Sequence, residues 1–125
     1  MRLLASVPVG RVGVTIDALP AVLPVNFVVS DGAVVFRTIP GTKLDSSTTD
    51  AVVAFEVDSY GTADDPGGWS VLVRGVAREL TDRTALASAG QMLESWALDG
   101  DADRFIRIEP TLLTGRRIIA RRSIS

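Results

Sequence analysis

The chain contains no cysteine and no histidine among its 125 residues. The absence of cysteine excludes a disulfide framework, a thiolate nucleophile and an iron–sulfur cluster. The absence of histidine excludes a catalytic triad that uses an imidazole, a histidine-ligated haem and an ordinary zinc site. Any chemistry must therefore come from carboxylates, hydroxyls, amines, guanidinium groups or a bound cofactor.

Neither sign of charge is in large excess. The chain has 13 basic and 15 acidic residues, for a formal net charge of −2, which does not indicate a nucleic-acid-binding protein. Four arginines form a locally positive segment near the end of the chain: Arg116, Arg117, Arg121 and Arg122. We expect them to keep an exposed end soluble; the alternative is that they hold an anionic cofactor across a dimer interface.

Long apolar runs are also missing. No stretch approaches the roughly 20 uninterrupted apolar residues of a membrane span, and the residues before Gly10 lack the order of a signal peptide. We therefore predict a cytoplasmic protein that binds neither membrane nor nucleic acid. Residues Arg2 to Val7 are typical of the end of a helix, as if the native chain began earlier.

The size and composition predict a single domain, residues 1–125. With 46% hydrophobic and 22% charged residues, the chain is too apolar to be disordered. A protein of 13.3 kDa buries about two-thirds of the surface of its unfolded chain, which is enough for one core.

Alternating apolar residues predict six strands. Their ranges are Arg11–Ile16, Ala21–Ser30, Ala33–Thr38, Ala51–Asp58, Trp69–Leu80 and Phe105–Ile119, the last interrupted at Pro110. Asp31 and Gly32 form a strong hairpin signal. Pro24 cannot donate to a ladder, so we expect it at a sheet edge or a bulge, and Gly75 in mid-strand predicts a bend or a close backbone approach.

Two segments are helical in pattern. Lys43–Asp50 suits one short helical turn, and an apolar stripe from Ala85 to Trp96 predicts a longer helix that Thr81 or Asp82 can cap. Six antiparallel strands with an early hairpin and a late helix predict a mainly β fold. We expect a small six-stranded Greek-key barrel with one or two helices.

The stretch from Val34 to Leu44 combines a strand end, a glycine-containing loop and the start of a short helix. Such a site suits a phosphate, because Thr38 and Thr42 can donate hydrogen bonds while Arg37 and Lys43 supply positive charge. Lys43 is the only lysine in the chain, a hint that this position is specified. The alternative is an ordinary solvated turn with a surface lysine.

Several segments, in this order, resemble the pyridoxamine 5′-phosphate oxidase-like family of flavin-binding split β-barrels. They are Leu23–Val29, Asp31–Gly32, Val35–Thr38, Gly41–Leu44, Val52–Asp58 and Trp69–Ala77. The resemblance runs from about Gly10 to Ile118. It implies a homodimer that holds FMN in clefts at the subunit interface.

The resemblance also implies which residues hold the cofactor. Thr42 and Lys43 match residues that hold the FMN phosphate, and Phe36, Arg37 and Thr38 match the strand end along the phosphate and ribityl chain. Pro24, Val25 and Asn26 match the strand that meets the isoalloxazine ring. Ser70 falls where the oxidase branch carries a glutamine that contacts the flavin. For Asn26, the alternative is that its side chain satisfies a strand edge beside a proline.

Two departures from the family narrow the expected function. The chain lacks the histidine-containing C-terminal segment with which the true oxidase closes over its substrate, so oxidation of pyridoxamine phosphate is not expected. The branch that resembles nitroimidazole reductases often has histidine where this chain has Arg37. We predict an FMN-binding oxidoreductase that acts on an unidentified small molecule and has no catalytic side chain of its own. The alternatives are a deazaflavin-dependent reductase and a non-catalytic flavin-binding module.

Other polar and aromatic residues receive structural interpretations. Glu56 and Asp58 share a strand face, where pairing with arginine or solvent is favoured over a general acid and base. Trp96 is expected in the core, whereas Trp69 suits either the core or the rim of a cleft. The acidic loop near Asp101 lacks the glycine and the final glutamate of a calcium loop, so no metal site is expected.

The strands Ala21–Val29 and Trp69–Ala77 are apolar on both faces for part of their length. A barrel of this size buries only one face of each strand, so the other face needs a partner, and a symmetric copy is the commonest solution. The pattern predicts a two-fold symmetric dimer that buries more than about 2,000 Å² in total.

Overall fold

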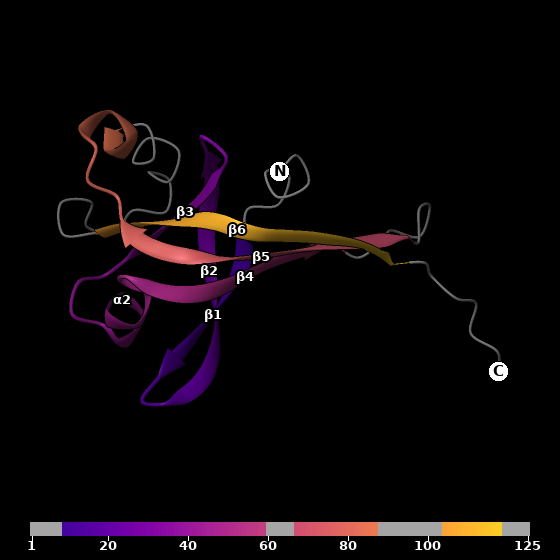
Figure 1. Cartoon of the computed structure of the whole chain (residues 1–125), viewed down its shortest axis with the longest axis horizontal. Coiled ribbons are helices and arrows are strands. Elements are labelled where there is room, and N and C mark those ends of the chain that lie inside the picture. The colour runs from indigo at the N-terminus through magenta and orange to yellow at the C-terminus, as the bar shows by residue number, and fades with distance from the viewer. Residues whose placement is uncertain (1–8, 60–66, 88–103, 119–125) are drawn as a thin grey trace.

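The computed structural model describes residues 9–59, 67–87 and 104–118. Six antiparallel strands close a barrel in the order β1-β2-β3-β6-β5-β4 (Figure 1). The elements are β1 (Val9–Ile16), β2 (Leu19–Ser30), β3 (Ala33–Thr38), α2 (Lys43–Thr48), β4 (Ala51–Ser59), β5 (Gly68–Glu79) and β6 (Arg104–Ile118), and a helical segment covers residues 83–87. The predicted mainly β barrel with short helices is confirmed.

Two tight hairpins set the register of the first three strands. Asp31 and Gly32 have φ angles of 49° and 74°, as a two-residue turn with both central residues in the left-handed region requires. Asp17 and Ala18, with φ angles of 51° and 65°, make the same kind of turn between β1 and β2. The predicted Asp31–Gly32 hairpin is therefore confirmed, and β2 begins two residues earlier than the sequence indicates.

The core lies inside the barrel and is built from alternate residues of every strand. Its side chains include Val12, Val14, Val25, Phe27, Val34, Phe36, Val53, Phe55, Val57, Val73, Ile106 and Ile108. Phe27 and Phe55 meet edge to face with their ring centroids 4.8 Å apart, a favoured aromatic geometry. The intervening residues of these strands point outward, although Ala33 and Val35 of β3 are buried on that side as well.

The last strand is continuous, so the predicted interruption at Pro110 is wrong. Pro110 pairs with Gly75 and Leu112 pairs with Arg74, which leaves Thr111 as one extra residue in a β-bulge. The hydroxyl of Thr111 donates to the carbonyl oxygen of Arg74 at 3.1 Å. A bulge accommodates a proline because a residue that cannot donate to the ladder loses nothing there.

β3 is much shorter than the two strands on either side of it in the closed barrel. β3 pairs with β2 only through Phe27–Ser30 and with β6 only through Arg104–Ile108. The rest of β2, including Pro24, pairs with β1, while the rest of β6 pairs with β5. The β1–β2 hairpin and the far end of β5 and β6 therefore extend from the barrel in different directions (Figure 1).

The start of the later predicted helix agrees with the structure. The Asp82 carboxylate accepts from the backbone N–H of Ala85 at 3.2 Å, which is the capping contact expected of that residue. The continuation of this helix and Trp96 lie outside the described residues, as do Arg2 to Val7. Trp69 packs partly buried against the core. Within the described ranges, no helix is long and apolar enough to cross a membrane.

Gly75 allows the close approach of β5 and β6 at the bulge. A Cβ atom at Gly75 would lie 1.9 Å from the carbonyl oxygen of Glu109, and a backbone atom cannot swing aside. We expect Gly75→Ala to lower the free energy of unfolding by about 1–3 kcal/mol, the usual range for overpacking. Urea titration followed by circular dichroism measures this change.

Gly13→Ala is the matched control. A Cβ atom at Gly13 would meet its nearest neighbour, the Cβ of Ala54, at 3.6 Å, which is an ordinary contact. This variant should keep the parent stability or gain slightly, since alanine restricts the unfolded chain. Equal stabilities for the two variants would contradict the close approach at Gly75.

Candidate functional site

A buried carboxylate joins α2 and its preceding loop to the barrel. Asp45 is 4% exposed and Thr38, at the end of β3, is 2% exposed. The hydroxyl of Thr38 donates to Asp45 Oδ1 at 2.9 Å, while Oδ2 accepts from the N–H of Gly41 at 3.2 Å and from Arg104 at 3.1 Å. These contacts fix the loop 39–42 against β3 and β6, because a buried carboxylate needs all of its partners.

The second threonine of the predicted phosphate site caps α2. Thr42 Oγ1 accepts from the N–H of Asp45 at 3.2 Å and donates to the carbonyl oxygen of Ile39 at 2.7 Å. The hydroxyls of Thr38 and Thr42 thus both have partners within the chain. A phosphate at this loop would rely mainly on cationic side chains.

Lys43 supplies such a cation in an exposed position. Its ammonium group pairs with Asp17 at the turn of the β1–β2 hairpin, and the two side chains are 70% and 72% exposed. An ion pair this exposed contributes little stability, so another anion can compete with Asp17 for Lys43. The space beside Gly41 is open, since a Cβ atom there would have no neighbour within 4 Å.

The predicted flavin residues of β2 and β3 divide between the core and the outer face. Val25 and Phe36 belong to the buried core, so only their backbone atoms are available to a ligand. Pro24, Asn26 and Arg37 alternate with core residues and lie on the outer face. The Phe27–Phe36 pair is at one end of the β2–β3 ladder. Asn26 and Arg37 are the next residues beyond this pair, one on each strand.

Ser70 lies on β5, a strand that carries none of the other predicted residues. It pairs with Asp58 on one side and with Arg116 on the other. Pro24 pairs with Arg11, whose side chain contacts Asp58, so Ser70 is connected to the β2 candidates through β1 and β4.

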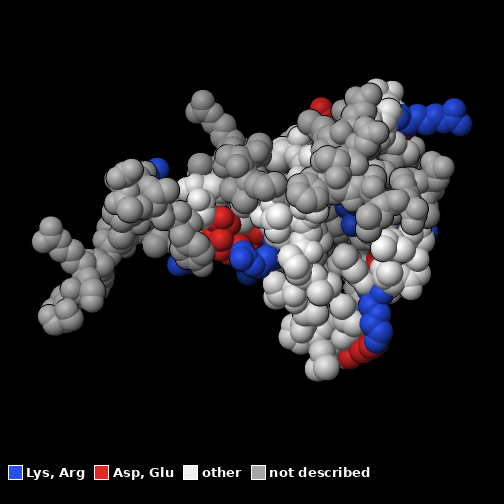
Figure 2. Space-filling view, turned by 180° about the vertical axis from the view of Figure 1, so that it is seen from behind, with Lys and Arg blue, Asp and Glu red and all other residues white. Residues whose placement is uncertain are grey.

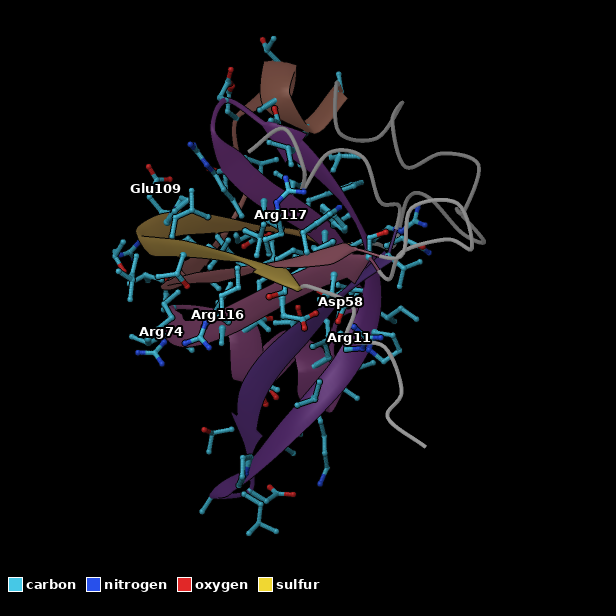
Figure 3. All side chains as sticks on the ribbon, turned by 90° about the vertical axis from the view of Figure 1, so that its right-hand side faces the viewer. Arg11, Asp58, Arg74, Glu109, Arg116 and Arg117 are labelled. Carbon is cyan, nitrogen blue, oxygen red and sulfur yellow. The ribbon has the colours of Figure 1, made fainter. Side chains whose placement is uncertain are left out.

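The carboxylates beside Ser70 form a cluster with an arginine of β1. Arg11 lies 3.2 Å from Glu56 and 3.4 Å from Asp58, and Figure 3 shows Arg11 and Asp58 together on the same side of the sheet. The arginine-paired strand face expected from the sequence is confirmed. Burial raises the pKa of Glu56, as do a hydrogen bond shared with Asp58 and the charge of Asp58, while Arg11 lowers this pKa.

Sequence reasoning missed Asp45, Arg104 and Arg11 as partners of the candidate residues. Arg104 is 59 positions from Asp45, and Arg11 is 45 positions from Glu56, so no local motif connects them. The one available signal was an aspartate in the first turn of a short helix, a common position for a carboxylate.

The raised pKa of Glu56 predicts a pH-dependent stability. A carboxyl group with a higher pKa in the folded than in the unfolded chain favours folding when protonated, and stability falls as pH rises through the folded pKa. Glu56→Gln should remove this loss, so its Tm relative to the parent should rise as the pH increases above about 4.5, the ordinary pKa of glutamate. A Tm difference that stays constant over this range would contradict the raised pKa.

The Asp45 contacts predict the effect of removing one carboxylate oxygen. Asp45→Asn weakens the contacts to Gly41 and Arg104 and should lower the free energy of unfolding by about 1–3 kcal/mol. Asp50→Asn is the control, because the Asp50 side chain is 70% exposed and pairs with the similarly exposed Arg78. Equal urea midpoints for the two variants would show that the buried network does not stabilise the fold.

Known proteins share this fold and much of this sequence. The pyridoxamine 5′-phosphate oxidase family model matches residues 1–117. The uncharacterized protein Rv0080 of Mycobacterium tuberculosis is 44% identical over 128 residues, which cover 96% of this chain and 81% of that protein.

Two solved structures are similar over almost the whole chain. An FAD binding protein from Mycobacterium smegmatis is 42% identical with a TM-score of 0.76, covering 94% of this chain and 90% of that one. A FAD-binding protein from Mesorhizobium loti is 26% identical with a TM-score of 0.78, covering 95% and 90%. The family match over residues 1–117, together with the closed six-stranded barrel, shows that this chain belongs to the pyridoxamine 5′-phosphate oxidase family.

Proposed function

We propose that the chain binds a flavin nucleotide, FMN in the first instance, and acts as an oxidoreductase on a small molecule. The observation that carries this proposal is the exposed Lys43, the only lysine of the chain, beside an open loop in a protein of this family. The similarity to two proteins named for FAD binding supports a flavin. The absence of cysteine and histidine supports redox chemistry that comes from a cofactor.

The residues around the loop 39–42 have the charge and the space that a flavin phosphate needs. Lys43 can leave its weak pair with Asp17 and bind a dianion, since both side chains are largely exposed. Arg37 adds a second positive charge from the end of β3, and the open space at Gly41 gives a phosphate room. The Asp45 network keeps this loop in place while its own carboxylate is neutralised by Arg104.

Binding and orientation are the tasks of this chain in the proposed activity. A bound flavin supplies hydride transfer, and the protein supplies position and electrostatics. Asn26 lies where the pairing of β2 with β3 ends and can hydrogen-bond a ring edge through its amide, and Pro24 and Val25 precede it on the same strand. No side chain of the chain is proposed to be catalytic.

FAD is the second candidate cofactor, favoured by the names of the two similar structures. Its pyrophosphate would bind the same cations, so charge alone does not separate it from FMN. Comparison of the two affinities for one preparation of protein decides between them. Tighter binding of FAD would replace FMN in the proposal and leave the site unchanged.

Substitutions in the Lys43–Asp17 pair should change the affinity for FMN in opposite directions. Hydrogen bonds to a charged group contribute about 1.5–3 kcal/mol each, so Lys43→Ala should weaken FMN binding roughly 10- to 150-fold. Asp17→Asn should strengthen it, because the variant removes the anion that competes with the phosphate. Fluorescence-quenching titrations measure both affinities.

Riboflavin is the matched control ligand, because it lacks the phosphate. Its affinity should hardly differ among the parent, Lys43→Ala and Asp17→Asn. Equal losses of FMN and riboflavin binding in Lys43→Ala would overturn the phosphate assignment. A protein that is stabilised thermally by a deazaflavin but by neither FMN nor FAD would overturn the flavin proposal and favour a deazaflavin-dependent enzyme.

A further inference from the structure

A cleft of about 260 Å³ lies on the outer face of β5 and β6, beside the segment that follows β5. In Figure 1 it is at the end of β5 that carries the arrowhead. Figure 2 shows acidic and basic side chains gathered where the other end of β5 leaves the body of the molecule, so the cleft is distinct from that charged group. Its lining residues, none of which is among the flavin candidates, are Val76, Arg78, Glu79, Leu80, Thr81, Asp82, Arg107 and Glu109.

Two arginines stand directly opposite each other in this cleft. Arg78 and Arg107 are cross-strand partners on β5 and β6, so their side chains leave the same face of the sheet with Cβ atoms about 4.5–5.5 Å apart. Like charges directly opposite each other repel and destabilise the strand pair. This position therefore favours an anion that contacts both guanidinium groups.

The carboxylates that the chain itself offers to these arginines are exposed. Arg78 lies 3.3 Å from Asp50, and the two side chains are 67% and 70% exposed. Arg107 lies 3.2 Å from Glu109, whose side chain is 63% exposed and stands at the periphery of the molecule in Figure 3. Ion pairs as exposed as these contribute little stability, so a ligand can displace either carboxylate.

The contact with Glu109 uses half of one edge of the Arg107 guanidinium. Nη2 faces Glu109, whereas Nε is buried and has no hydrogen-bond partner among the described residues. The N–H bonds of Nε and Nη2 are parallel, a geometry that binds both oxygens of a carboxylate. Because a buried donor without an acceptor is unfavourable, a carboxylate that contacts both nitrogens satisfies this edge better than Glu109 does.

The remaining carboxylates of the cleft limit the charge that a ligand can carry. Glu79 lies 3.5 Å from Arg104, and Asp82 accepts from the N–H of Ala85 at 3.2 Å, so both have partners in the chain and stay beside the cleft. They repel a dianion such as phosphate more strongly than a group with one negative charge. The hydroxyl of Thr81 is available to the uncharged part of a ligand.

We infer that this cleft binds a small molecule with a single carboxylate group, held by the Nε–Nη2 edge of Arg107 and by Arg78. The carboxylate takes the place of Glu109 and relieves the repulsion between the two guanidinium groups. The inference does not depend on the proposed flavin function, because the two sites share no residue.

Acetate is the probe that tests this site. At constant ionic strength, with chloride as the balancing anion, acetate should raise the Tm of the parent chain in a saturable manner, since a ligand of the native state stabilises it. Arg107→Gln should raise the half-saturating acetate concentration roughly tenfold or more. Glu109→Gln should lower that concentration, because it removes the competing carboxylate. Arg74→Gln is the matched control, an exposed arginine of β5 outside the cleft, and should respond as the parent does.

Inorganic phosphate at the same ionic strength distinguishes a carboxylate site from a general anion site. Both probes are compared in Lys43→Ala, so that phosphate bound at the loop 39–42 does not contribute, and acetate should give the larger rise in Tm. Glu109→Gln changes an exposed side chain and keeps the test decisive even if Arg107→Gln unfolds. A parent Tm that does not respond to acetate, an equal response in Arg107→Gln, an unchanged half-saturating concentration in Glu109→Gln, or a larger response to phosphate would each overturn the inference.

Discussion

The short strand β3 determines how the rest of the barrel is arranged. It has six residues and lies between the 12 residues of β2 and the 15 residues of β6. β2 and β6 pair with it over only part of their length. Beyond β3, and within the described residues, β2 pairs only with β1 and β6 pairs only with β5. The end of the β2–β3 pairing beside Asn26 and Arg37 and the extended end that carries Arg116 both follow from this mismatch in length.

The candidate site combines a rigid support with an exposed cation. Asp45 and Thr38 are buried and fully engaged with Gly41 and Arg104, so the loop before α2 is held by contacts to two strands. Lys43 projects from this support into solvent, where it pairs with the exposed Asp17. Such an arrangement suits anion binding, because little reorganisation of the backbone is needed when a ligand displaces a weak surface pair.

The sequence was most informative where structure depends on neighbouring residues. The Asp31–Gly32 turn, the alternation of β1 to β5 and the cap at Asp82 are local patterns, and the structure has them. Continuity of β6 past Pro110 depends on a bulge opposite Gly75, which the sequence of β6 alone does not specify. The contact between Asp45 and Arg104 was also out of reach, because the two residues are 59 positions apart.

The central claim is that the chain holds a flavin nucleotide, and absorbance measures it directly. Titration of the full chain with FMN should shift and sharpen the visible flavin band, saturate at one flavin per chain, and release the flavin on denaturation. Burial of the ring in a protein site changes its surroundings, whereas free flavin keeps its solution spectrum. A spectrum that remains that of free flavin with both FMN and FAD would contradict the account.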